Sequence, residues 1–398
     1  MVVTRQPTDC SSTGTSPSSA PARPLAANGR PARAEASTGR PRRTLVVVNA
    51  SGRSGIGERA RWVAKAAAGA EILYREGGRL RALSSFIAGV FRTKPELLYA
   101  VDNAIATLIA VLVARVVFRA RVVVDTGDAT GVLARSTGRG GFPGFLAATL
   151  VERVGYLLAD TIVVRAKGLC DLVRETVGRK AVVIPDGFDP ALAGPRDGIA
   201  FRKTWGATDH TLVVGLLGSA SWNKRLQWCY GRDVVEAIAR AGRPDLLGVV
   251  IARGNGIPHL ERLTDNLGAG DRLRFVEPLE GEALWEQLGG LDVALSTQTN
   301  DAVGQSRTTG KLVQYLAAGK FILASRVGTA AAVLPEDMLV EYHGAWDDGY
   351  FDRLATRIDD LPNRAQVRKR GLEIRGRSAA FAYPALMPRW ERIFSTLT

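Results

Sequence analysis

The sequence predicts an α/β protein built from two Rossmann-like, doubly wound parallel sheets that face a cleft. Short runs of Val, Ile and Leu alternate with helical patterns after residue 43, as expected for parallel strands buried on both faces. The runs form two groups of six, separated by the turn-rich segment PDGFDPALAGPRDG. Because β–α–β units have right-handed crossovers, each group is expected to form one sheet with helices on both faces.

The predicted strands follow in two sets along the chain. The first set comprises residues 44–49, 70–74, 96–101, 120–125, 160–165 and 180–185. The second set comprises residues 210–218, 246–253, 271–277, 292–297, 321–325 and 338–342. The apolar stretch 104–118 contains Arg115 and is shorter than the roughly 18 residues of a membrane span, so we expect a buried helix there.

Composition divides the chain into five parts. They are a disordered tail over 1–43, a first domain over 44–190, a linker over 191–208, a second domain over 209–375 and a C-terminal helix over 376–398. The tail is rich in Ser, Pro, Ala and Arg without apolar periodicity, which is typical of disorder. It has no hydrophobic segment of the kind that a secretory signal needs.

The net charge of +14 favours phosphorylated ligands or anionic surfaces as partners. Nucleic acid is not expected, because basic and aromatic residues are not interleaved. Three isolated Cys indicate a reducing compartment, so we expect a cytoplasmic protein. Three His without ligand spacing argue against a zinc site, and no metal site is predicted.

Two turns of the second domain combine cations with helix starts. In GQSRTTGKLVQYLAAGK, Arg307 and Lys311 flank the expected start of a helix over 309–318, together with the hydroxyls of Thr308 and Thr309. A helix N-terminus with added cations is suited to an anion such as a diphosphate. The alternative is a loop whose charges face solvent.

The other turn, GLLGSASWNKR over 215–225, has Gly215 and Gly218 for close backbone approach and Lys224 and Arg225 for neutralising phosphate. It does not match GxGxxG, and no acid follows at the spacing that a nicotinamide ribose requires, so a dehydrogenase is not expected.

Several segments, in order, resemble GT-B nucleotide-sugar glycosyltransferases, specifically glycosyltransferase family 4. They are VVIPDGFDP, GLLGSASWNKR, VVIARGNGIPHLERL, DRLRFVEPL, TTGKLVQYLAAGKFILASRVG and YPALMPRWERIFSTL, within about residues 44–397. The resemblance implies a C-terminal helix that crosses back to the first domain. It also implies an acceptor-side first domain, a second domain that binds a UDP- or GDP-type sugar, and a hydroxyl acceptor that is a glycan, a lipid-linked molecule or a natural product. No cofactor is expected.

The same resemblance assigns site residues. Lys224 and Lys311 would hold the donor diphosphate and act in catalysis, with Asp128 as the polar group nearest the sugar; the alternative for Asp128 is a loop cap. Gly55 and Gly57 would lie in a loop near donor and acceptor. The remaining donor-binding residues would be Gly218, Ser219, Arg225, Arg253, Gly254, Arg274, Phe275, Arg307, Thr308, Thr309 and Gln314, with Arg274 and Phe275 at the nucleobase wall.

The sequence departs from the family pattern at several positions. Gln314 stands where an acid usually binds the ribose, Ser306 where many relatives have another acid, and Ser219 where many have Arg. No His follows the fourth strand. These departures motivate an alternative, a catalytically silent sugar-nucleotide binder or partner subunit. A nucleotide-sugar epimerase is a further alternative, but it would be expected to carry more His, Glu and Asp in the cleft.

Charge predicts the mechanism. Lys, Arg and a helix N-terminus can stabilise the leaving diphosphate, and no Asp-X-Asp motif occurs, so we expect catalysis without a metal. Retention of configuration is implied by the resemblance alone.

Residues 77–95 place Leu80, Leu83, Ile87, Val90 and Phe91 on one helical face among basic residues. The helix is interpreted either as a peripheral contact with the inner face of an anionic membrane or as packing on its own sheet.

Overall fold

The structure, a computed structural model, describes residues 42–138 and 140–397. All but the last two residues of the predicted tail therefore lie outside the described residues, and the prediction of disorder is not tested.

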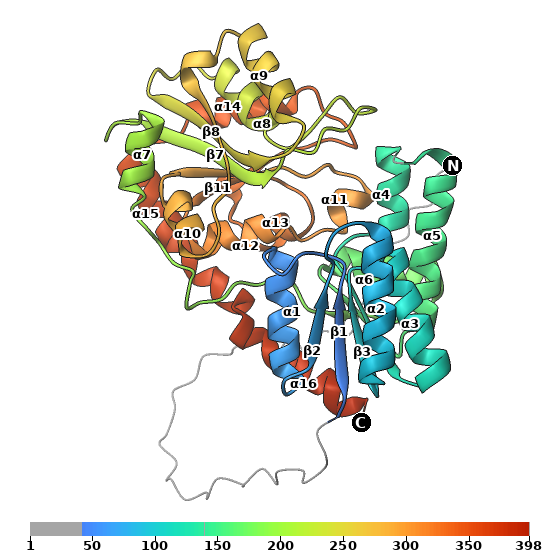
Figure 1. Ribbon diagram of the computed structural model, residues 1–398. Coiled ribbons are helices and arrows are strands. Elements are labelled where there is room, and N and C mark those ends of the chain that lie inside the picture. Colours follow the sequence, from blue (N-terminus) through green and yellow to red (C-terminus); the bar gives the residue numbers. More distant parts are fainter. Residues whose placement is uncertain (1–41, 139, 398) are drawn as a thin grey trace, which may run out of the picture. The chain divides into compact units, whose positions relative to one another are not determined.

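Two six-stranded parallel sheets form the framework of the described chain (Figure 1). The strands of the first sheet are β1 (Thr44–Val48), β2 (Glu71–Tyr74), β3 (Leu97–Val101), β4 (Arg121–Thr126), β5 (Thr161–Val164) and β6 (Val182–Val183). Those of the second are β7 (Leu212–Ser219), β8 (Leu246–Arg253), β9 (Leu273–Val276), β10 (Val293–Ser296), β11 (Phe321–Ser325) and β12 (Leu339–Val340). The two predicted groups of six are confirmed.

Helices connect successive strands. In the first domain they are α1 (Gly55–Ala66), α2 (Arg79–Thr93), α3 (Ile105–Phe118), α4 (Thr130–Thr137), α5 (Gly141–Leu158) and α6 (Lys167–Val177). In the second they are α7 (Ile199–Trp205), α8 (Arg232–Arg240), α9 (Ile257–Asn266), α10 (Glu282–Gly289), α11 (Ala302–Gln305), α12 (Gly310–Ala317), α13 (Gly328–Val333), α14 (Tyr350–Asp359) and α15 (Arg364–Ile374). The last helix is α16 (Tyr383–Thr396).

The strand order contains a reversal in each sheet. The orders are β2-β1-β3-β4-β5-β6 and β12-β11-β10-β7-β8-β9. In the second sheet the chain runs outward from β7 to β9 and then returns to the other side of β7 as β10. Ligands of such sheets bind beyond the carboxyl ends of the strands at this reversal. The segments after β7 and β10 are therefore where a site is expected.

Helices cover both faces of the first sheet. Alternate residues of β1 face opposite sides, so that Leu45 packs in one apolar cluster and Val46 in the other. The side of Val46 is covered by α1 and by α16, whose Leu386 and Trp390 are buried there. The predicted return of the C-terminal helix to the first domain is thus confirmed, and with it the fold class.

The helix predicted over 77–95 is α2, and it packs on its own sheet. Its residues Ala82, Phe86 and Val90 are buried, whereas Leu80 and Phe91 are exposed. The prediction that Leu80, Val90 and Phe91 share one face was therefore wrong, because Val90 points into the core while the other two are exposed. Among the described residues, no helix has the length and apolar character needed to cross a bilayer.

Candidate functional site

Lys311 lies in the first turn of α12, and its ammonium group is buried without a hydrogen-bond partner among the described residues. The Nζ atom is 3.8 Å from the centroid of the Tyr230 ring. A Cβ atom built on Gly218, at the end of β7, would lie 3.7 Å from the same Nζ. Burial lowers the pKa of Lys311, and the positive charge of Arg307 lowers it further. An unpaired buried cation is unfavourable, so this position favours an anion.

The start of α12 adds to the positive potential around Lys311. Thr309 precedes the helix with extended backbone and makes no side-chain capping bond, so first-turn N–H groups stay free of a protein cap. The helix is fixed against the sheet by Tyr315, whose hydroxyl accepts a hydrogen bond from Leu217 N at 2.7 Å. This contact holds the helix N-terminus beside the end of β7.

The pKa of Tyr230 responds to the same positive charges. Burial would raise the pKa of its phenol, but the cations of Lys311 and Arg307, together with a hydrogen bond from Gln298, lower it. The three side chains come from the segments after β7 and β10, as the strand order leads one to expect.

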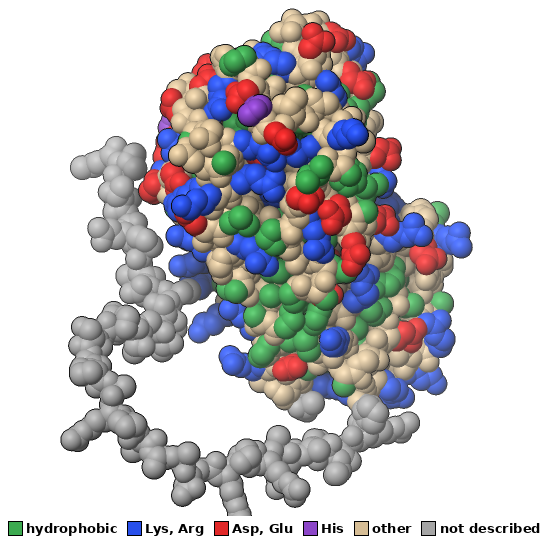
Figure 2. Space-filling model, turned by 90° about the vertical axis from the view of Figure 1, so that its left-hand side faces the viewer, with side chains coloured by type: hydrophobic (Ala, Val, Ile, Leu, Met, Phe, Trp, Pro, Cys, Tyr) green, Lys and Arg blue, Asp and Glu red, His purple; other side chains and the backbone are tan. Residues whose placement is uncertain are grey.

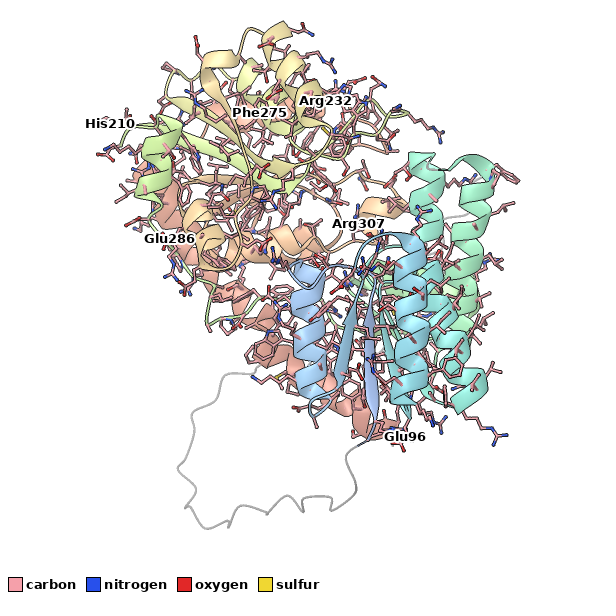
Figure 3. The ribbon with its side chains drawn as sticks, in the orientation of Figure 1. Glu96, His210, Arg232, Phe275, Glu286 and Arg307 are labelled. Atoms are coloured by element: carbon pink, nitrogen blue, oxygen red, sulfur yellow. The ribbon has the colours of Figure 1, made fainter. Side chains whose placement is uncertain are left out.

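Arg307 and Thr308 connect the second domain to the first. The Arg307 Nε atom lies 2.6 Å from Asp128 Oδ1, beyond the end of β4. The Thr308 hydroxyl donates to the carbonyl oxygen of Arg165 at 3.0 Å and contacts Thr329 Oγ1 at 2.6 Å. In Figure 3, Arg307 lies where α11 approaches the first domain. Asp128 is therefore held in place by Arg307. The Thr308 hydroxyl already has hydrogen-bond partners within the protein.

The segment between β7 and α8 has its two predicted cations, Lys224 and Arg225, exposed at the surface. Lys224 is exposed, and Arg225 donates through Nη1 to the carbonyl oxygen of Arg135 in α4 at 3.2 Å. The Ser219 hydroxyl pairs with Ser221 at 3.0 Å. The structure thus brings together Lys311, Gly218, Arg307 and Asp128, while Lys224 is exposed.

The turn after β8 requires glycine. Gly254 has a φ of +148°, and a Cβ atom there would clash with the carbonyl oxygen of Ala220. Its neighbour Arg253 points to Glu277, with Nε 3.2 Å from Oε2. The turn therefore lies against the segment after β7.

Arg274 and Phe275 do not reach this edge of the sheet. They pair in register with Val249 and Val250, well before the end of β8 at Arg253. The Arg274 guanidinium donates to the carbonyl oxygens of Trp205, Asp271 and Leu273. Both side chains serve the frame of the second domain. The motif predicts that both residues lie on this strand. It does not predict which way their side chains point or how far along the strand they lie.

The remaining predicted residues lie at helix starts or on α12. Ser54 caps α1 by accepting a hydrogen bond from Gly57 N at 3.1 Å. A Cβ atom on Gly57 would come within 2.5 Å of the Ser51 carbonyl oxygen, whereas Gly55 faces open space. Gln314 is half-buried on α12, and its side-chain amide has no hydrogen bond among the described residues.

A buried polar network between α1, β3, β4 and α16 at the first sheet was not predicted. Asp125 accepts hydrogen bonds through Oδ2 from Arg59 Nε at 2.8 Å and from the Tyr99 hydroxyl at 2.7 Å. Trp390 of α16 donates to the Tyr99 hydroxyl at 3.1 Å. Arg165 lies 3.6 Å from Asp125 Oδ1. The one available signal was a charge at position 59, where the apolar stripe of α1 predicts a core residue.

Among the described residues, no group of three or more His, Cys, Asp or Glu is arranged to hold a metal ion.

Comparison with known proteins supports the predicted resemblance. No protein-family model matches the chain. A D-inositol 3-phosphate glycosyltransferase of Stackebrandtia nassauensis is 30% identical over 223 residues, which are 52% of this chain and 47% of the relative. The chain thus spans about half the length of the curated relative that it matches. A second such enzyme, from Geodermatophilus obscurus, is 28% identical over 39% of this chain and 37% of its own.

Solved structures share the whole two-domain arrangement. Sucrose-phosphate synthase of Thermosynechococcus elongatus superposes with a TM-score of 0.69 at 17% identity, over 89% of this chain and 99% of its own. The Anabaena protein HepE, in complex with UDP-glucose, gives the same TM-score, identity and coverage. The chain has the GT-B fold, and the predicted resemblance to glycosyltransferases is confirmed.

Proposed function

We propose that this GT-B chain is a glycosyltransferase that moves a sugar from a nucleotide-diphosphate donor to a hydroxyl acceptor. The proposal rests on one observation: a buried ammonium group, without a hydrogen-bond partner among the described residues, at the start of α12 and beside Gly218 near the end of β7. A diphosphate bound there would supply the negative charge that Lys311 lacks, and the free N–H groups of α12 would donate to its oxygens.

The fold and the relatives narrow the donor class. HepE, which shares the fold, has been crystallised with UDP and with UDP-glucose, and the matched curated relatives are named glycosyltransferases. These likenesses support a UDP-sugar as the first donor to test, with GDP-sugars second.

The reaction follows from the charges. As the bond between the anomeric carbon and the phosphate oxygen breaks, negative charge grows on the leaving diphosphate. Lys311, the N-terminus of α12 and Arg307 are placed to stabilise that charge, each such group contributing about 2–4 kcal/mol in a closed site. These cations support reaction without a metal. Retention of configuration is proposed by analogy of fold alone.

Asp128 and Lys224 have different parts in this proposal. Asp128 orients Arg307 through both carboxylate oxygens, with Nε 2.6 Å from Oδ1 and Nη2 3.4 Å from Oδ2, at the edge of the first domain where the sugar is expected. Lys224 lies exposed, so its action on the diphosphate requires the segment between β7 and α8 to rearrange when the donor binds.

The alternative is a silent sugar-nucleotide binder or partner subunit, which the replacements at Gln314 and Ser219 favour. Both functions predict nucleotide binding, so turnover separates them. Donor hydrolysis should be followed with UDP- and GDP-sugars, with Lys311→Ala as the negative control. Release of UDP or GDP that depends on Lys311 supports the enzyme. Saturable binding without release from any donor, with and without hydroxyl acceptors, supports the silent binder.

We further propose that the chain is cytoplasmic and makes its peripheral membrane contact through α5 and not α2. The large apolar side chains Phe142, Leu146, Leu150 and Leu157 recur on one face of α5 and are between 49% and 71% exposed. Val116 and Val117 extend this exposed apolar surface on α3, which packs beside α5. A monomer rarely exposes an apolar stripe of this length without a binding role.

Charge favours an anionic bilayer as the partner of this surface. The chain carries a net charge of +14, and the exposed Arg153 and Arg135 lie on α5 and on the neighbouring α4. Basic residues beside an apolar helix face are typical of helices that lie in the plane of an anionic membrane. Such a contact would bring a lipid-linked acceptor to the first domain, since α4 follows the carboxyl end of β4 and Glu152 of α5 accepts hydrogen bonds from Thr130 N and Gly131 N there.

A further inference from the structure

A basic cavity lies at the far end of α12 from Lys311, at the amino-terminal edge of the second sheet. Its volume is about 240 Å³, which is room for about eight water molecules at ~30 Å³ each. It is lined by Pro195, Arg196, Asp197, Leu291, Asp292, Ala318, Gly319, Lys320, Arg368 and Leu372. Figure 2 views the side of the molecule on which α7 and α15 lie in Figure 1, and Lys and Arg side chains are prominent there.

Positive charge exceeds negative charge around this cavity. Asp292 is fully buried, and three guanidinium groups surround it: Arg202 at 2.7 Å, Arg364 at 3.1 Å and Arg368 at 3.8 Å. Lys320, which precedes β11, adds a fourth cation beside the same carboxylate. With Arg196 of the wall there are five basic groups, against three carboxylates: Asp292, Asp197 of the wall, and Glu286 beside Arg196. Basic groups therefore outnumber acidic ones around the cavity.

Three basic side chains that line the cavity have hydrogen-bonding capacity to spare. Lys320 is 4% exposed and donates to the carbonyl oxygens of Gly289 and Leu291 at 2.9 and 2.8 Å, which leaves its third N–H. Arg196 Nε forms an ion pair with Glu286, 3.2 Å from Oε1, but its N–H makes no hydrogen bond among the described residues. Arg368 reaches Asp292 only at 3.8 Å, beyond hydrogen-bonding distance.

The geometry points to a binding site for a phosphoryl dianion, either inorganic phosphate or a small phosphate monoester, held by Lys320, Arg368 and Arg196. Arg presents a planar fork that matches phosphate oxygens, and Lys adds a compact charge. The burial of Lys320 among Arg368, Arg202 and Arg364 lowers its pKa to about 7, despite Asp292, and a bound anion would relieve that penalty. This site is separate from the donor site, because the two occupy opposite ends of α12.

The cavity wall also includes the segment that enters the second domain. Pro195, Arg196 and Asp197 belong to the predicted linker and precede α7. An anion bound between Arg196 of this segment and Arg368 of α15 would fix the linker to the second domain. The expected consequence is a higher unfolding temperature when the site is filled.

The test is calorimetric titration of the full chain with inorganic phosphate, with glucose 6-phosphate and with chloride as the ionic-strength control. Arg368→Gln removes a half-exposed donor of the cavity. Lys369→Gln makes the same charge change on the exposed neighbouring position of α15 and is the matched control. We expect saturable binding of phosphate or the ester, a loss of about tenfold in affinity for Arg368→Gln, and no change for Lys369→Gln.

The outcomes separate the ligand sources and the proposal itself. Tighter binding of glucose 6-phosphate identifies a sugar phosphate as the ligand, and equal or tighter binding of phosphate identifies the free ion; both support a phosphoryl site. Arg368→Gln and Lys369→Gln are checked for an unchanged unfolding transition without ligand. No saturable binding to the wild-type chain, or equal affinities in the two variants, overturns the proposal. The titration is repeated in the Lys311→Ala background, so that phosphate bound at the donor site is not counted and failure of the donor site remains distinguishable.

Discussion

Arg307 of the second domain and Asp128 of the first form an ion pair, with Nε 2.6 Å from Oδ1. The two residues are 179 positions apart in the sequence, and each follows a strand of a different sheet. The pair ties the edge that carries Lys311 to the edge where the first domain's loops end. Both side chains keep some solvent exposure, 26% for Arg307 and 37% for Asp128, so the pair can exchange partners when a ligand arrives.

The strength of this pair can be measured by a double-mutant cycle. We expect Asp128→Asn and Arg307→Gln each to lower the free energy of unfolding modestly, with a coupling energy of about 0.2–1 kcal/mol, as for partly exposed ion pairs. Chemical denaturation of the four proteins gives the coupling. Strictly additive effects would show that the two charges do not interact in solution.

Asp125 should behave very differently from Asp128, although only two residues separate them. Asp125 is fully buried against the equally buried Arg59, and loss of its charge leaves that cation beneath α16 with only the more distant carboxylate of Asp186, at 3.9 Å. We expect Asp125→Asn to lower the free energy of unfolding by about 3–5 kcal/mol. Asp128→Asn is the matched control for the same substitution at a partly exposed site. Similar denaturation midpoints for the two variants would contradict the structural role given to the buried network.

The apolar face of α5 is tested by membrane binding. We expect the wild-type chain to co-sediment with vesicles that contain phosphatidylglycerol and to bind far less to phosphatidylcholine vesicles, because both the apolar contact and the basic charge are needed. The double variant Leu146→Glu/Leu150→Glu should lose this binding. Leu267→Glu, at an exposed Leu after α9 in the second domain, is the control.

The identity of the partner is decided by the same variants. If the double variant binds vesicles as the wild type does, the membrane contact through α5 is wrong. If instead the wild type is a dimer in solution and the double variant a monomer, a second copy of the chain covers the face.

Lys320 predicts a particular pH dependence of stability. Its pKa is lowered to about 7 in the folded protein and returns to its ordinary value of 10.5 on unfolding. Between these values the unfolded chain holds one more proton, so the free energy of unfolding rises with pH, by up to about 1.4 kcal/mol per pH unit. Lys320→Met removes this contribution.

The measurement is denaturation of the wild type and of Lys320→Met at several values between pH 7 and 9.5. The difference between the two proteins isolates Lys320 from other titrating groups, such as Lys311, whose lowered pKa acts in the same direction. The stability of the wild type relative to the variant should rise with pH across this range. A difference that is flat or falls with pH would contradict the burial of an uncompensated lysine.

Apolar runs predicted the strands well because both sheets are buried on both faces. The run over 246–253, for example, is β8 without change of bounds. The helix expected over 309–318 is α12 over residues 310–317, because Thr309 and Gly319 punctuate it. The bounds of these elements depend on hydrophobic periodicity and on turn residues, and both are features of neighbouring positions that can be read from the sequence.

Features that depend on distant residues could not be predicted in the same way. No local pattern indicates that Arg307 meets Asp128, or that Trp390 reaches Tyr99 at a separation of 291 positions. Motif position placed Arg274 near the ligand, but its side chain bonds to carbonyl groups of its own frame. The basic groups around Asp292 come from α7, from α15 and from Lys320 before β11, which the sequence keeps far apart.

The most direct test of the account is the binding of UDP and GDP to Lys311→Ala. Removal of a charge-assisted contact to the diphosphate should weaken the best nucleotide by about 1.5–3 kcal/mol, or roughly 10- to 100-fold. Lys203→Ala, at an exposed lysine of α7, should bind as the wild type does. Calorimetric titration of the three proteins gives the result: selective loss in Lys311→Ala supports the site, and unchanged nucleotide affinity in that variant contradicts it.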